Sequence, residues 1–204
     1  MSFFQQYCDA LSRALAGAST QGGDGVASAE PLAPLLAESQ RLKASGATQF
    51  FVGNGASSAL ASHVAADWTK NGGIASLALT DAALLTAAAN DLGVEEMFAS
   101  PLARLGRAGD LLVTISSSGN SPNILRAIAA ARAAGMRVVT FSGLRPDNQS
   151  RALGDANVYV PARTYGIVES AHQVLLHAWL DAFLGVEEWN RAVEQNMRAS
   201  AYTP

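Results

Sequence analysis

The sequence has 204 residues, of which 49% are hydrophobic, which is enough for one domain or for one domain with a helical extension. Only 15% are charged, below the ~25% usual for globular proteins, which indicates that part of the surface is covered in an oligomer. The net charge of −3 gives no basic surface for nucleic acid, and the single cysteine excludes an internal disulfide and a cysteine-based metal site. No run approaches the ~18 apolar residues of a membrane span, and the first residues lack the basic start of a signal peptide, so we expect a cytoplasmic protein.

The first 46 residues predict two helices that come before any strand. Ser2 can cap the first helix, and Cys8 falls within its apolar pattern as a small core residue. The glycine-, serine- and threonine-rich run 17–25 is typical of a mobile loop, and Ser28 can cap the second helix. We expect these helices to pack on the main domain and to contribute contacts within an oligomer.

From residue 47 onward, short apolar runs alternate with helical patterns. Several runs are apolar on both faces, as a parallel sheet covered by helices on both sides requires. We therefore predict an α/β fold with a doubly wound five-stranded parallel sheet over residues 47–204 and an N-terminal helical extension over residues 1–46. Ligands should gather at the carboxyl ends of the strands. The expected strands are Gln49–Gly53, Ala75–Leu79, Leu111–Ile115, Arg137–Phe141 and Asn157–Val160, and the expected helices are Ser57–Lys70, Glu95–Leu105, Pro122–Ala134, Tyr165–Leu184 and Glu187–Arg198.

Two loops after expected strands have the composition of an anion-binding site. In the first, Gly53 and Gly55 allow a sharp turn, and Ser57 or Ser58 can cap the next helix, whose free N–H groups favour an anion. A dinucleotide fingerprint needs a third glycine where Ser58 stands, which disfavours a Rossmann-type site. An ordinary strand–helix connection is the alternative.

The second loop, Ser116–Ser121, follows an apolar strand and has the sequence Ser-Ser-Ser-Gly-Asn-Ser. Pro122 suits the first position of the next helix, with Ser121 as its N-cap. Several hydroxyls and backbone N–H groups then converge on one helix start and favour a dianionic phosphate without any lysine. A polar capped turn is the alternative, and the absence of a Gly-Lys-Ser/Thr motif disfavours nucleotide hydrolysis.

All three histidines of the chain lie on two expected helices that also carry carboxylates. His63 and Asp67 are four residues apart on one helix face, and Glu169, His172 and His177 share the late helix. Imidazole and carboxylate groups suit Zn²⁺ or a similar divalent ion, and the same groups could instead move protons. For each histidine alone, a packed and hydrogen-bonded structural role is the alternative.

These residues resemble the sugar isomerase (SIS) domain family, and within it the phosphoheptose isomerases, from about Phe50 to Leu184. The stretch 53–57 is similar to the family's Gly-Asn-Gly-Gly-Ser, with Ala56 at its fourth position, and Ser116–Ser121 is similar to its Ser-Thr-Ser-Gly-Asn-Ser loop. The other similar stretches are Ala89–Gly93, which carries an Asn-Asp pair, and Val168–His177 in the last helix.

The resemblance implies an aldose–ketose isomerase that converts sedoheptulose 7-phosphate to D-glycero-D-manno-heptose 7-phosphate through an enediol, for lipopolysaccharide or other surface glycans. It also implies one zinc ion per subunit and a homotetramer whose sites neighbouring subunits complete. Asp67 and His177 would be catalytic, and His63, Asp67, Glu169 and His177 would hold the metal. The family has glutamate at Asp67 and glutamine at Glu169. The residues that would bind substrate are Asn54, Gly55, Ser57, Asn90, Asp91, Ser116, Ser117, Ser118, Ser121 and Glu169.

The main alternative is a non-catalytic SIS module that senses a sugar phosphate or binds a protein partner, as replication-initiator-binding relatives do. Such paralogues share the loops but lose parts of the carboxylate and histidine set. Asp67 and His177 are both present here, which favours the enzyme. A plain oligomeric scaffold would leave the serine loop unexplained.

Overall fold

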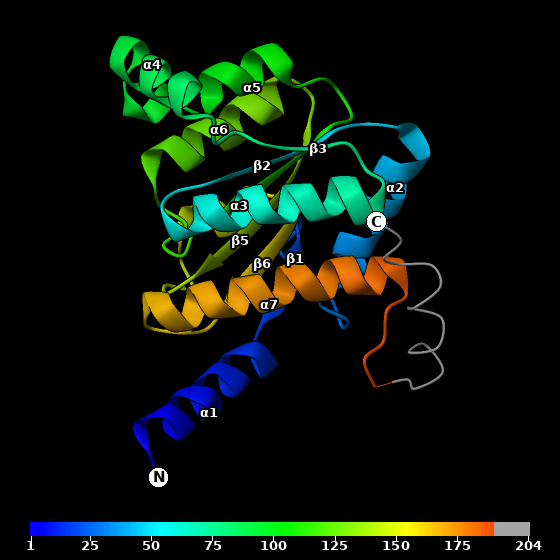
Figure 1. Cartoon of the computed structure of the whole chain (residues 1–204), viewed down its shortest axis with the longest axis vertical. Helices are drawn as coiled ribbons and strands as arrows, with labels where there is room; N and C mark the ends of the chain where they lie inside the picture. Colours follow the sequence, from blue (N-terminus) through cyan, green and yellow to red (C-terminus); the bar gives the residue numbers. More distant parts are fainter. Residues whose placement is uncertain (190–204) are drawn as a thin grey trace.

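The computed structural model describes residues 1–189, which form a sheet with helices on both of its faces (Figure 1). The sheet has six strands in the order β1-β6-β5-β4-β2-β3. Strands β2 to β6 run parallel to one another, which confirms the expected doubly wound sheet. The strands are β1 (Ser19–Gly22), β2 (Gln49–Gly53), β3 (Ser76–Ala78), β4 (Leu111–Ile115), β5 (Arg137–Gly143) and β6 (Ala156–Val160).

The sixth strand, β1, corrects the expected loop at residues 17–25. It pairs antiparallel with β6, with Ser19 opposite Tyr159 and Gly22 opposite Ala156. Its four residues are too few and too polar for a periodic signal, so their pairing depends on the free edge of β6. The N-terminal segment therefore contributes a strand to the main sheet, while a boundary at residue 46 stays a prediction.

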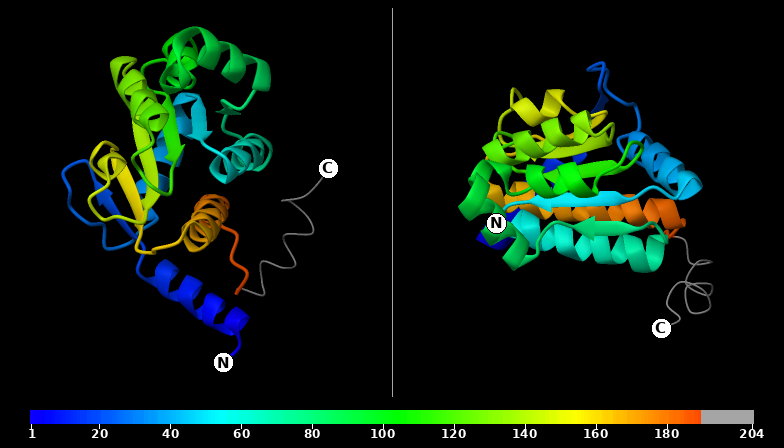
Figure 2. Two further views of the ribbon diagram at one scale, coloured as in Figure 1. Left: turned by 90° about the vertical axis from the view of Figure 1, so that its left-hand side faces the viewer. Right: turned by 90° about the horizontal axis from the view of Figure 1, so that it is seen from above.

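Two groups of helices cover the two faces of the sheet (Figure 2). One face carries α2 (Ala33–Ser45), α3 (Ala56–Asp67) and α7 (Tyr165–Leu184), and α1 (Phe3–Ala16) packs on α7. The other face carries α5 (Ala99–Leu105) and α6 (Pro122–Ala133), and α4 (Ala82–Leu92) lies beside them (Figure 1). Alternate residues of each strand enter opposite cores, since Phe51, Val113 and Val139 pack with α3 and α7 while their neighbours pack with α5 and α6.

The helices follow the expected pattern with four corrections. Residues 82–92 form a helix that was not expected, capped by Asp81, whose carboxylate accepts a hydrogen bond from the Leu84 N–H at 2.8 Å. The expected helix 95–105 is a 3₁₀ turn, η2 (Val94–Glu96), followed by α5. Ser28 does not cap α2 but donates to the Glu30 carbonyl at 2.7 Å. Cys8 is exposed rather than buried, because α1 turns that face away from α7.

The expected last helix, 187–198, falls mostly outside the described residues, and residues 188–189 form a turn. Within residues 1–189, no helix is long and apolar enough to cross a membrane.

Candidate active site

The loops singled out in the sequence meet where the strand order reverses. From β2 the chain moves to β3 at one edge of the sheet and then returns to β4 on the other side of β2. The loops that follow β2 and β4 therefore leave neighbouring strands in opposite directions and open a crevice at their carboxyl ends. Open α/β sheets bind ligands at this point.

The first loop is a tight turn from β2 into α3. A side chain at Gly53 would lie 2.7 Å from the backbone of Ser57, so only glycine allows the turn. Ser57 is buried at the start of α3. Asn54 exchanges two hydrogen bonds with Asn123 on α6, of 3.0 and 2.8 Å, which join the two sides of the crevice. Nothing in the sequence singled out Asn123, because its role depends on the pairing of β2 with β4.

The serine loop between β4 and α6 is held in shape from behind by the end of β5 and the segment that follows it. Gly119 has a φ of +61°, and a side chain there would collide with the Asn148 amide. The Ser150 N–H donates to the Gly119 carbonyl at 3.0 Å, and the Gly143 N–H donates to the Ser117 carbonyl at 3.0 Å. The hydrogen bonds fix the backbone while the serine side chains face the opposite way, towards the crevice.

A cavity of about 210 Å³ lies in front of this loop. The Ser116 and Ser118 hydroxyl oxygens accept backbone N–H groups of Gly119 and Asn120 at 3.2 and 3.3 Å, so their own protons are free to donate. The Ser117 hydroxyl is buried and has no partner among the described residues. Unsatisfied buried hydroxyls are costly, so these groups indicate a bound ligand rich in oxygen. The lining residues are Asn54, Ser57, Ile115, Ser116, Ser117, Ser118, Ser121, Tyr165 and Glu169.

The helices α3 and α7 lie side by side and bring together three of the four expected metal ligands (Figure 1). His63 Nε2 is 3.3 Å from an Asp67 carboxylate oxygen, and the His63 and His177 ring centres are 5.3 Å apart. One donor atom from each of His63, Asp67 and His177 lies within 4.8 Å of the others. We call these three residues the His-Asp-His cluster.

Aromatic packing fixes the spacing of α3 and α7 beside the cluster. Trp68 follows Asp67 in the chain, is fully buried and meets Trp179 edge-on with ring centres 5.1 Å apart. The Trp179 indole N–H donates to the Ser39 hydroxyl at 2.8 Å, which ties the pair to α2. Two large buried rings leave the helices little freedom to separate.

Residues of the cluster are suitable for a divalent metal. Two imidazoles and one carboxylate are the donors of many catalytic zinc sites, which keep a fourth position open. The His177 Nε2 atom is buried without a hydrogen-bond partner among residues 1–189. Zinc bonds of ~2.0–2.2 Å place two ligands at most about 4.4 Å apart, so the observed separations need only small side-chain adjustments.

Three other expected site residues lie apart from the cluster. Glu169 lies about two helical turns before His177 and lines the cavity of the serine loop. Asn90 and Asp91 are exposed at the end of α4, where the Asn90 amide donates to the Asp91 carboxylate at 2.7 Å. Neither residue lines the serine-loop cavity, so within one subunit they stand outside the site.

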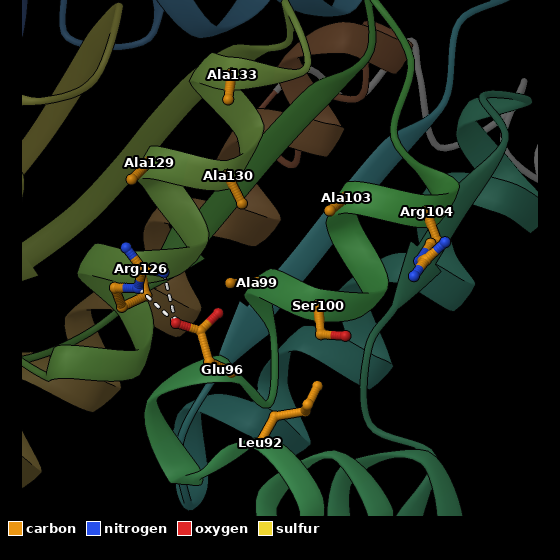
Figure 3. Close-up of a pocket in the computed structure, with 10 residues that line it drawn as sticks. All are labelled: Leu92, Glu96, Ala99, Ser100, Ala103, Arg104, Arg126, Ala129, Ala130 and Ala133. Atoms are coloured by element: carbon orange, nitrogen blue, oxygen red, sulfur yellow. Dashed lines mark hydrogen bonds and ion pairs between the residues drawn. The ribbon is translucent and has the colours of Figure 1, made fainter.

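A larger cavity, of about 580 Å³, lies elsewhere, between α5 and α6 (Figure 3). Its walls are mainly alanine side chains, and the Arg126 side chain donates to the Glu96 carboxylate at 2.7 Å near one end. Its lining includes no histidine and only one serine, Ser100. We therefore place the candidate site at the crevice, where the serine hydroxyls and the His-Asp-His cluster lie, although the cavity there is smaller.

Comparison with known proteins identifies the family of the chain. The family model described as "SIS domain" matches residues 6–143. The phosphoheptose isomerase of Thiobacillus denitrificans is 37% identical over 176 residues, which cover 78% of this chain and 89% of that protein. The one from Paramagnetospirillum magneticum is 36% identical over 170 residues, covering 80% and 88%.

Solved structures show the same likeness. The phosphoheptose isomerase GmhA of Neisseria gonorrhoeae is 34% identical, with a TM-score of 0.76 over 88% of this chain and 94% of that chain. A phosphoheptose isomerase from Francisella tularensis shares the fold with a TM-score of 0.73. Both the sequence and the fold match along most of their lengths, so the chain belongs to the SIS domain family and, within it, to the phosphoheptose isomerases, which are enzymes.

Proposed function

We propose that this isomerase interconverts sedoheptulose 7-phosphate and D-glycero-D-manno-heptose 7-phosphate. One observation supports the proposal above all: the His-Asp-His cluster lies on the same two helices as the serine-loop cavity, further along them. Ser57 and His63 are six residues apart on α3, or about 9 Å along its axis. The seven-carbon backbone of the sugar spans about 8 Å from C1 to C7 at ordinary bond lengths. A phosphate on C7 at the serine loop therefore leaves C1 and C2 near the cluster.

The phosphate would be held by Ser57 and the serine loop. Ser116, Ser117, Ser118 and Ser121 provide hydroxyl donors, and the start of α6 adds the favourable end of a helix dipole. Asn54, Gly55 and Glu169 would contact sugar hydroxyls. Asn90 and Asp91 would reach a site only from a neighbouring subunit, since within one subunit they lie outside the cavity.

Asp67 and His177 would move the protons. In the ketose-to-aldose direction, the Asp67 carboxylate takes a proton from C1 while protonated His177 gives one to the C2 oxygen, which yields a cis-enediol. Asp67 then returns its proton to C2, and the C1 hydroxyl gives its proton to His177 as the aldehyde forms. Atoms and charges balance, because each residue ends in its starting state.

One zinc ion per subunit would be held by His63, Asp67 and His177, with Glu169 as a fourth ligand only if its side chain reaches towards them. A bound metal would polarise the substrate oxygens as a Lewis acid and would take the place of the His177 proton, because an imidazole that binds zinc is neutral. Calorimetric titration of the protein with zinc should show one site per chain, and the His63→Ala variant should bind at least tenfold more weakly. Equal zinc binding by both proteins would refute this metal site.

The proposal includes a homotetramer. Phe3 and Phe4 on α1 are 81% and 75% exposed, which is unfavourable for an isolated chain and suits a covered interface. Light scattering at micromolar concentration should give a multiple of the 21.1 kDa chain mass. A single-chain mass would refute the oligomer.

The decisive assay offers the full-length protein sedoheptulose 7-phosphate with and without added zinc. Turnover to the aldose is the expected result. If no C5–C7 ketose phosphate is turned over under either condition while phosphate binding persists, the non-catalytic sensor becomes the better assignment.

A further inference from the structure

A second cavity, of about 260 Å³, lies beside that of the serine loop and shares Ser57 and Glu169 with it. It lies between α3 and α7, and α1 contributes Tyr7 to its wall. The remaining lining residues are Ala56, Leu60, Gly166, Ser170, His172 and Gln173. Leu60 and Gln173 each stand about one turn before His63 and His177, so this cavity lies between the phosphate region and the His-Asp-His cluster.

His172 is the one fully buried titratable group among these lining residues. Its Nε2 atom is 3.1 Å from the Ser142 carbonyl oxygen. A carbonyl only accepts, so Nε2 carries the hydrogen and Nδ1 is left with a lone pair. Burial lowers the pKa of His172 to about 4, so the ring is neutral near pH 7. The Phe141 ring meets the imidazole at 84°, which helps to fix its orientation.

The His172 Nδ1 atom is buried and has no hydrogen-bond partner among the described residues. A buried acceptor without a donor is unfavourable, and natural proteins seldom leave one. His172 lines the cavity of about 260 Å³, which has room for several non-hydrogen atoms. A neutral nitrogen that can only accept is suited to a hydroxyl donor and offers nothing to a phosphate oxygen, which is itself an acceptor.

We infer that this cavity holds the middle of the sugar chain and that His172 Nδ1 accepts a hydrogen bond from one sugar hydroxyl there. The inference rests on the proposed function for the identity of the sugar. It assigns His172 as a specificity-determining residue that contacts substrate but takes no proton from it. A ketose phosphate that lacks the contacted hydroxyl should bind more weakly, because it leaves Nδ1 without a donor.

Two substitutions separate this contact from the structural role of the ring. His172→Phe and His172→Asn both lose the hydrogen bond to Ser142, so both should lower the stability of the protein. Asn alone places an acceptor oxygen near the position of Nδ1. Calorimetry on the full-length variants with sedoheptulose 7-phosphate and with inorganic phosphate then isolates the contact, since both variants share the structural defect.

The Phe variant should bind sedoheptulose 7-phosphate about two- to tenfold more weakly than the Asn variant, the range expected for one neutral hydrogen bond. Both should bind inorganic phosphate equally. Equal affinity of the two variants for the sugar phosphate would overturn the inference, and so would a parallel loss for inorganic phosphate. Absence of turnover by the wild type would refute the isomerase proposal but leave this binding comparison intact.

If the Phe variant does not fold, the test instead measures how tightly the wild type binds ketose phosphates that each lack one hydroxyl. One of them should bind about two- to tenfold more weakly to the wild type than the parent sugar, with a similar deficit in the Asn variant, which keeps an acceptor at that position. Equal binding of all the deoxy analogues to the wild type would overturn the inference.

Discussion

The serine loop and the His-Asp-His cluster are built in different ways. Ser116 and Ser117 are each only 6% exposed, and backbone hydrogen bonds with Phe141 and Gly143 of β5 fix their backbone. In the cluster, the side chains of His63 and Asp67 are 53% and 29% exposed, and they stand on helix surfaces. In the proposed function, phosphate binding would use a preformed main-chain turn, whereas the chemistry would use side chains that a substrate, a metal or a neighbouring subunit must still arrange.

This difference separates the two regions experimentally. Changes in the serine loop should alter affinity and leave the chemical step largely intact. Changes in the cluster should do the reverse, because the two regions contact opposite ends of the proposed substrate.

The largest effect is expected from the Ser116→Ala and Ser118→Ala double substitution. It removes two donors to a charged group, each worth about 1.5–3 kcal/mol, so the affinity for sugar phosphate should fall by about 3–6 kcal/mol. Calorimetry measures the loss, and thermal unfolding serves as the control for folding. Undiminished affinity in a folded variant would contradict the assignment of the loop.

Substitutions in the cluster should lower turnover. Asp67→Asn and His177→Ala should each reduce kcat by about 10²–10⁴, the usual cost of losing a positioned acid or base. The affinity for inorganic phosphate should remain within about twofold of the wild type. Should Asp67→Asn remain fully active, Asp67 would not be the base, although the isomerase assignment would stand.

Stability should depend on pH through His172, which lies between the two regions. Burial lowers its folded-state pKa to about 4 from 6.5, so the unfolded chain binds more protons between these values. The stabilising effect of the neutral ring is complete above pH 6.5 and is lost as the pH falls towards 4. Urea unfolding should show that this group lowers the unfolding free energy by about 2 kcal/mol at pH 5 relative to pH 7. The His172→Asn variant should lack that contribution, and an identical pH dependence in both proteins would exclude it.

The smallest effect is expected from Asp67→Glu, the matched control for Asp67→Asn. It keeps the charge and adds one methylene, so the carboxylate reaches about 1.5 Å further. Turnover of sedoheptulose 7-phosphate should be preserved or raised. A loss as large as that of Asp67→Asn would show that the position of the carboxylate, and not only its charge, is fixed by the surroundings.

The sequence predicted the five parallel strands and the helices at 122–133 and 165–184 because their signals are local. Runs such as Leu111–Ile115 are apolar on both faces, and Pro122 marks a helix start. Strand β1, the place of Tyr7 in a cavity wall and the contact of Asn123 with Asn54 could not be predicted, because a free strand edge and the packing of α1 and α6 determine them. The exposure of Cys8 was missed for the same reason. The apolar pattern around Cys8 predicts a helix, but it does not show which face of that helix packs on α7.

By itself, the sequence determined which residues could bind phosphate and which could move protons, because composition and spacing fix the chemistry of a loop or a helix face. Only the tertiary structure decided which of them meet. It brought His177 to His63 and Asp67 and left Glu169 about two turns away beside the serines, because α3 and α7 lie side by side with their Trp68–Trp179 contact fixing the distance. Helical periodicity specifies a direction around one axis, whereas the contact between two helices depends on the sheet on which both of them pack.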